Sequence, residues 1–193
     1  MAKKFEFKPD KPRAGFFSRL YLTQKQRKSL LKWVLYTLVL LFLSVLQDVL
    51  LCNLDIFGAT TELVPCAIFL ICLLEGSETG SLFLLISSCI YVFSGTAAGN
   101  YCIVFITVFG VLATFLRQSY LQKGLFAALI CVFLAMVFYE IAVFGIGLFF
   151  SRTYVGRFWV FPWTALLSMV IVPPLYPVCC SISKIGGGEP WKE

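Results

Sequence analysis

The chain has 193 residues, of which 60% are hydrophobic and 13% are charged, and its formal net charge is +6. A soluble globular domain has about 45–50% apolar and about 25% charged residues, so this composition excludes an ordinary water-soluble core and indicates a protein that folds in a lipid bilayer. The apolar stretches are continuous, without the alternation of a membrane β-barrel. At about 20 residues per span they predict an all-α bundle of membrane-crossing helices.

The amino-terminal segment, residues 1–28, is polar and basic. Ten of the sixteen Lys and Arg residues lie in the first 32 positions. In so apolar a chain this charge favours a cytoplasmic anchor on anionic headgroups over nucleic-acid binding. A helix lying in the membrane interface and an unstructured tail are both compatible with the segment. The basic residues that we expect to face lipid are Arg19, Lys25, Arg27, Lys28 and Lys32.

Six apolar stretches follow, and we expect each to be a helix that crosses the membrane. They form one domain, residues 29–183, before a short tail, residues 184–193. The second and third stretches are short, so one re-entrant hairpin is the alternative there. The sixth contains four prolines, which should kink the helix or end it early. The expected spans are 30–51, 62–74, 81–93, 101–116, 125–150 and 159–182.

The positive charges favour one orientation of these spans. With the amino terminus in the cytoplasm, the cytoplasmic segments carry fourteen Lys and Arg residues and the outer loops carry two. Cytoplasmic loops of membrane proteins are enriched in Lys and Arg. We therefore expect both termini in the cytoplasm.

Polar side chains within the apolar stretches are candidates for a special role, because a charge at the centre of a span costs about 2.5–3.5 kcal/mol. Glu140 is the deepest of them. It is either a buried anchor or a proton or ligand site, or its carboxylate reaches the outer interface. Gln47 and Asp48, at the outer end of the first span, are expected at the wet interface, with pairing to Asn53 as the alternative.

The polar stretch 75–80 reads Glu-Gly-Ser-Glu-Thr-Gly and predicts a cytoplasmic turn between the second and third spans. Glu75 and Glu78 are expected to be solvated carboxylates rather than a catalytic pair. Gly76 and Gly80 form a Gly-x-x-x-Gly pattern, which lets two backbones approach closely.

The chain has eight cysteines and no histidine. Without histidine, most metal sites and most base-assisted nucleophilic chemistry are excluded. Cysteines inside apolar stretches act as small hydrophobic residues. No phosphate-binding, hydrolase or metalloprotease motif is present. We expect a protein that is not an enzyme and that has no metal or cofactor.

Several local sequences resemble a known family. The first span ends in Leu46-Gln47, the sequence Ile-Phe-Gly-Ala follows at 56–59, and Pro65 lies in the next helix. The stretch 73–80 then reads Leu-Leu-Glu-Gly-Ser-Glu-Thr-Gly. With six expected spans, the chain resembles MreD, the rod-shape-determining membrane protein family of bacteria, over about residues 30–150.

The resemblance implies a scaffold of the bacterial inner membrane. Such proteins act with the single-span protein MreC in the elongation complex, which links actin-like filaments to peptidoglycan synthesis and maintains rod shape. It also implies a fold like the substrate-binding subunit of energy-coupling-factor vitamin transporters, so a small-molecule transporter subunit is the alternative. That alternative needs a pocket with convergent polar groups, for which the candidates are Gln47, Asp48, Asn53 and Asn100.

Overall fold

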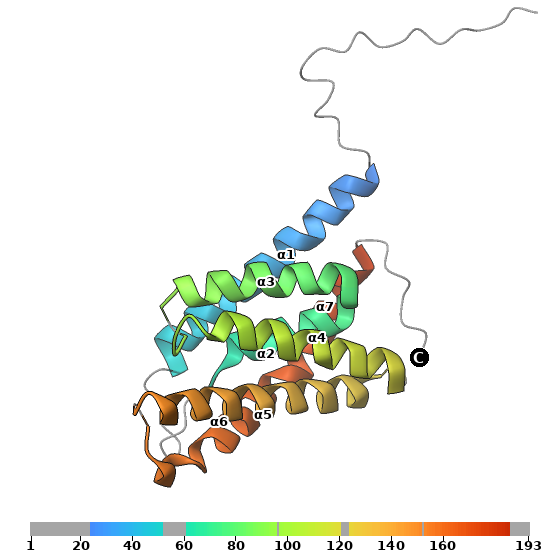
Figure 1. The fold of residues 1–193 in the computed structure, drawn as a ribbon. Helices are drawn as coiled ribbons and strands as arrows, with labels where there is room; N and C mark the ends of the chain where they lie inside the picture. The colour runs from blue at the N-terminus through green and yellow to red at the C-terminus, as the bar shows by residue number, and fades with distance from the viewer. Residues whose placement is uncertain (1–23, 52–60, 96, 121–123, 152, 186–193) are drawn as a thin grey trace, which may run out of the picture.

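A computed structural model describes residues 24–51, 61–95, 97–120, 124–151 and 153–185, and every regular element in these ranges is helical (Figure 1). The predicted all-α class is therefore confirmed for the described part of the chain. The helices are α1 (Gln24–Leu46), α2 (Leu63–Glu75), α3 (Ser77–Phe93), α4 (Cys102–Tyr120), α5 (Leu125–Phe149), α6 (Val160–Ser168) and α7 (Val172–Ile185), with short helical turns η2 (Gln47–Leu51), η3 (Val155–Arg157) and η4 (Met169–Ile171).

Three stretches of the described chain are long and apolar enough to cross a membrane, namely Gln26–Val49, Leu125–Phe149 and Val155–Ile185. They indicate a membrane protein. The other three predicted segments are also helical but shorter. The shortest, α2, has 13 residues, so it is about 20 Å long, whereas the apolar core of a bilayer is about 30 Å thick.

The short helix α2 lies at the centre of the bundle. All its residues from Leu63 to Leu74 are buried, and the side chains from Cys66 to Ile71 are 0% exposed. It contacts α1, α3, α4, α5 and α7 (Figure 1). A helix that is apolar on every side can be enclosed on every side. The other helices therefore surround α2, and α2 has no face for lipid.

Two glycines set how α3 packs on α2. Gly76 is the single residue between the two helices and has φ 88° and ψ −179°, a conformation essentially restricted to glycine. A Cβ on Gly80 would lie 2.8 Å from the carbonyl oxygen of Cys72, so this position has room only for hydrogen. The backbones of α2 and α3 therefore approach closely at Gly80, whereas a Cβ on Gly76 would meet no atom nearer than 3.7 Å.

The amino-terminal end of the bundle differs from expectation, whereas the last segment agrees with one of the two alternatives. Helix α1 begins at Gln24, inside the segment expected to be an arm, and its first turns project beyond the other helices (Figure 1). The remainder of the arm, including Arg19, lies outside the described residues. At the other end, the short turn η4 divides the last segment into α6 and α7 directly before Pro173 and Pro174, but the segment does not end early. Pro173 and Pro174 lie in the first turn of α7, where a missing N–H does little harm, and α7 continues to Ile185.

Candidate functional site

The carboxyl end of α2 is held by an ion pair. Glu75 binds Lys32 of α1 through Oε2, and Tyr36 donates a hydrogen bond of 2.7 Å to Oε1. The side chains of Lys32 and Glu75 are only 12% and 5% exposed. The expectation of a solvated Glu75 and a lipid-facing Lys32 is therefore wrong. The pairing joins residues 43 positions apart, which local sequence does not reveal.

Two more contacts complete this end. The guanidinium of Arg117, in α4, donates from Nη1 to the carbonyl oxygen of Leu73, and the side chain is 5% exposed. Tyr36 also lies 3.3 Å from the carbonyl oxygen of Cys179 in α7 and donates to it. The last carbonyls of a helix lack partners within the helix and favour positive charge. Arg117 supplies both a donor and a charge there.

The amino end of α2 is capped by a residue distant in sequence. Gln47 Oε1 accepts hydrogen bonds from the backbone N–H groups of Leu63, at 2.9 Å, and Val64, at 3.1 Å. The backbone N–H of Glu62 donates to Ser168 Oγ at 2.8 Å. Because an unpaired N–H in a bilayer is costly, these contacts stabilise a buried helix start. Gln47 is thus a structural cap, and only its neighbour Asp48 is exposed as expected.

Four side chains gather beside this amino end and are called here the Glu62 cluster: Glu62, Tyr91, Tyr139 and Glu140. The Tyr91 hydroxyl lies 3.5 Å from Glu62 Oε2 and donates to it. Glu140 is 2% exposed and interacts electrostatically with Glu62. Glu140 is therefore buried, as one interpretation of the sequence predicts, rather than exposed at the outer interface. The sequence alone identifies Glu62 only as the first residue of the expected second span, 62–74. A carboxylate directly before a fully apolar helix was the signal that could have identified it.

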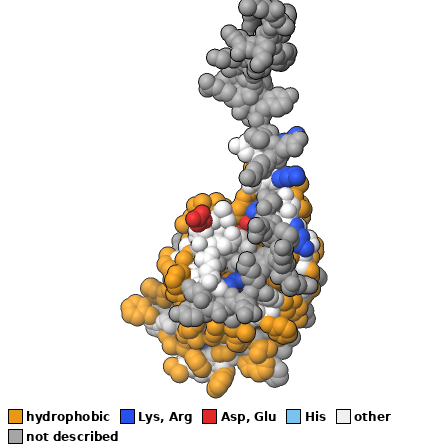
Figure 2. Space-filling view, turned by 90° about the vertical axis from the view of Figure 1, so that its right-hand side faces the viewer, with side chains coloured by type: hydrophobic (Ala, Val, Ile, Leu, Met, Phe, Trp, Pro, Cys, Tyr) orange, Lys and Arg blue, Asp and Glu red, His pale blue; other side chains and the backbone are white. Residues whose placement is uncertain are grey.

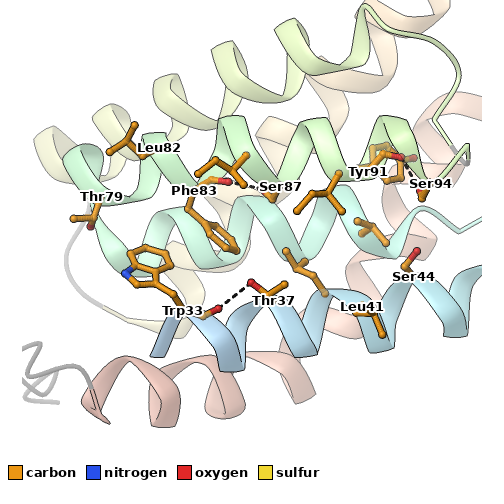
Figure 3. A pocket seen from close by; sticks show the side chains of 14 residues that line it. Trp33, Thr37, Leu41, Ser44, Thr79, Leu82, Phe83, Ser87, Tyr91 and Ser94 are labelled. Carbon is orange, nitrogen blue, oxygen red and sulfur yellow. Dashed lines mark hydrogen bonds between the residues drawn. The ribbon is translucent and has the colours of Figure 1, made fainter. Parts of the chain in front are cut away.

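A groove runs between α1 and α3, and its volume is about 550 Å³ (Figure 3). We call it the α1–α3 groove. At one end the ring of Trp33 packs 5.3 Å from that of Phe83, measured between ring centroids. Apolar side chains with high exposure, such as Leu41 at 65% and Leu82 at 67%, border it. The lining residues are Trp33, Thr37, Leu40, Leu41, Ser44, Val64, Thr79, Leu82, Phe83, Ile86, Ser87, Ile90, Tyr91 and Ser94.

Most hydroxyls in the groove are used within their own helix. Thr37 donates to the carbonyl oxygen of Trp33 at 2.9 Å, and Ser87 donates to that of Phe83 at 2.6 Å. Ser94 donates to that of Tyr91 at 2.7 Å (Figure 3). A hydroxyl that donates its hydrogen to a backbone carbonyl has no hydrogen left to donate to a ligand. The groove therefore presents an essentially apolar surface.

The remaining predicted residues lie at the surface or outside the description. Arg27 and Lys28 are exposed on the projecting turns of α1, where Figure 2 shows basic side chains above an apolar bundle surface. Glu78 and Asn100 are exposed as well. Lys25 belongs to α1, whereas Asn53 lies outside the described residues.

Among the described residues, no group of three or more Cys, Asp or Glu side chains is placed to hold a metal ion. Seven cysteines are described and all are free thiols. Comparison of the chain with protein-family models, with curated proteins and with solved structures gives no match.

Proposed function

We propose that the protein is a non-enzymatic scaffold of the MreD type in the cell-wall elongation machinery of the bacterial inner membrane. All six apolar segments would cross the membrane, with both termini in the cytoplasm. In this role it couples a single-span MreC-type partner and cytoskeletal filaments to peptidoglycan synthesis. The observation that carries the proposal is the α1–α3 groove.

The groove suits the transmembrane helix of a single-span partner. Helices associate in lipid mainly by close packing, and small residues at the interface let the backbones approach. Ser44 and Ser87 supply small side chains within the groove, and Leu82 and Ile86 on α3 are 67% and 55% exposed at its edge. A groove of this kind binds an apolar helix by shape, without charged contacts.

The buried polar groups support a structural role. Lys32 and Arg117 bind groups of α2 at one end, and Gln47 binds backbone N–H groups at the other. These side chains join α1, α4 and the turn η2 to α2. The alternative, a vitamin-type transporter subunit, needs several polar groups that converge in a pocket. The α1–α3 groove is apolar, which favours the scaffold.

The projecting turns of α1 provide a second contact surface. Arg27 and Lys28 are exposed there. Basic residues beside a membrane bind anionic headgroups, and they also attract acidic protein surfaces. On the proposed orientation these turns face the cytoplasm, where filaments lie.

Depletion of the protein in a rod-shaped bacterium that carries it tests the role in cell shape. We expect the rods to become round while the membrane stays intact. Unchanged rods with normal lateral incorporation of peptidoglycan precursors would refute the scaffold function.

Site-specific photo-crosslinking tests the groove itself. A photoreactive amino acid at Leu41 or Ile86 should crosslink to the single-span partner in the cells. The matched control is Ile130 of α5, which is 51% exposed and does not line the groove. Crosslinks of equal yield at all three positions would show that the partner does not select the groove.

A further inference from the structure

The segment that joins α5 to α6 exposes aromatic side chains at one end of the bundle. Tyr154 and Trp159 are 64% and 71% exposed, and Trp163, in the first turn of α6, is 47% exposed. In Figure 1 this segment lies at the lower left of the bundle, whereas the first turns of α1 project at the upper right. The two features therefore lie at opposite ends. We call the exposed residues the Trp159 surface; they are Tyr154, Arg157, Trp159 and Trp163.

The opposite side of the same segment is packed on α5. The rings of Phe158 and Phe161 lie 5.5 Å and 5.0 Å from that of Phe144, measured between ring centroids, and Phe144 is 7% exposed. The backbone N–H of Arg157 donates to the carbonyl oxygen of Tyr154 at 3.0 Å and closes the turn η3. The segment is thus held in place from inside, while the rings of the Trp159 surface remain accessible from outside.

A positive charge lies among these rings. Arg157 is exposed, and its guanidinium carbon Cζ lies 5.6 Å from the centroid of the Tyr154 ring. Among the described residues, no carboxylate forms an ion pair with this arginine. A guanidinium stacked on an aromatic face keeps its N–H donors at the edge, where they match the geometry of a phosphate. The Trp159 surface therefore combines an apolar contact area with a phosphate-binding group.

The place of this surface in the chain matches a membrane–water interface. The last apolar span, Val155–Ile185, begins within it. Tyr101, from the turn before α4, lines a cavity of about 280 Å³ together with Phe150, so a second loop adds an aromatic ring beside the segment. Trp and Tyr concentrate where lipid meets water, because their rings are apolar and their N–H and O–H groups are polar. An exposed surface of this composition is suited to lipid headgroups.

We propose that the Trp159 surface binds the phospholipid headgroups of the membrane. Its rings lie at the level where the acyl chains begin, and the Arg157 guanidinium binds a lipid phosphate. This contact fixes the depth at which the short helix α6 enters the bilayer. On the proposed topology the lipids belong to the outer leaflet. The inference needs only a membrane-spanning chain, so it stands apart from the scaffold function.

Depth-dependent quenching of Trp159 fluorescence tests this position in phosphatidylcholine vesicles. The other tryptophans are replaced in the triple variant W33F, W163F and W191F, so that only Trp159 emits. Lipids brominated near the carbonyl end of their acyl chains should quench it more than lipids brominated near the methyl end. The comparison is L134W in a tryptophan-free chain, because Leu134 is 40% exposed near the middle of α5, and there the order should be reversed.

Two outcomes would overturn the proposal. Stronger quenching by the methyl-end bromines would place Trp159 inside the hydrocarbon core. Absence of quenching by any brominated lipid would place it in water, on a surface open to a protein partner. If the triple variant does not fold, 5-fluorotryptophan in the otherwise unchanged protein gives the same depth by ¹⁹F NMR with spin-labelled lipids. The Trp159 signal is then identified by its absence from W159F.

Replacement of the arginine tests the phosphate contact separately. Part of the phosphatidylcholine is exchanged for brominated phosphatidylglycerol, whose headgroup has a net negative charge. The lipid beside Trp159 should be phosphatidylglycerol with about a fivefold preference, the effect of one cation near a charged membrane surface, and R157Q should abolish this preference. The matched control is K184Q, since Lys184 is an exposed cation in the last turn of α7, and it should behave like the wild type. Equal preferences in the wild type and R157Q would overturn the assignment of Arg157.

Discussion

Lys32 and Glu75 form an ion pair that is almost closed to solvent and ties the projecting helix α1 to the carboxyl end of α2. Tyr36, one turn further along α1, donates to the same carboxylate. Lys32 therefore has a structural role, although the neighbouring basic residues suggested that it contacts lipid.

Breaking this pair should destabilise the bundle. Lys32→Met leaves the Glu75 carboxylate buried without its cation, and the loss of a buried partner costs about 3–5 kcal/mol. Lys32→Met with Glu75→Gln removes both charges and should recover much of that loss. Unfolding in detergent followed by tryptophan fluorescence measures both variants. The control is Lys28→Met, at an exposed position; an equal loss of stability in this variant would contradict the assignment.

The turn between α2 and α3 should not tolerate a side chain. Gly76→Ala forces a residue with a Cβ into φ 88°, which costs about 1–3 kcal/mol. Gly80→Ala places a methyl group 2.8 Å from a backbone oxygen and should also cost about 1–3 kcal/mol through overpacking. Gly145→Ala is the comparison, since a Cβ there meets nothing within 4 Å. Melting temperatures should fall in the first two variants and stay level in the third.

The cap on α2 should depend on the Gln47 oxygen. Gln47→Leu keeps a similar volume but leaves the N–H groups of Leu63 and Val64 without their acceptor, at a cost of about 1–3 kcal/mol for a buried unpaired group. Hydrogen exchange at these two amides should become faster. Asp48→Asn, on the exposed neighbour, should leave the exchange rates unchanged. Slow exchange in Gln47→Leu would mean that another group caps the helix.

Filling the α1–α3 groove should separate folding from function. Ile86→Trp adds bulk at a position that is 55% exposed and lines the groove, so the bundle should keep its melting temperature while partner binding is lost. Ile130→Trp adds the same bulk on an exposed face of α5. Restoration of rod shape after depletion distinguishes them: the second variant should restore it and the first should not.

Much of the fold follows from local sequence. The apolar stretches lie where the helices are found. The turn between α2 and α3 lies within the predicted stretch 75–80, but it is the single residue Gly76, because α3 already begins at Ser77. Both features depend on residues close together in the chain. Helix formation needs only a continuous apolar stretch in lipid, and the turn needs only a residue that tolerates a positive φ.

The central position of α2 could not be predicted in this way. A lipid-facing helix and an enclosed helix are both apolar on all sides, so hydropathy does not separate them. The contacts that decide the matter join distant parts of the chain, as Glu75 does with Lys32 and Gln47 with Leu63. For the same reason the sequence predicts only one member of the Glu62 cluster, Glu140. Glu140 was conspicuous within an apolar stretch, but its neighbours come from two other elements.

The enclosure of α2 also constrains how the protein is made. The short helix receives bonds from Gln47, synthesised before it, and from Ser168 and Arg117, synthesised after it. A nascent chain that stops before α6 lacks the serine that holds the start of α2, and one that stops before α4 also lacks the arginine at its end. The contacts that hold both ends of α2 are therefore complete only after α6 has been synthesised.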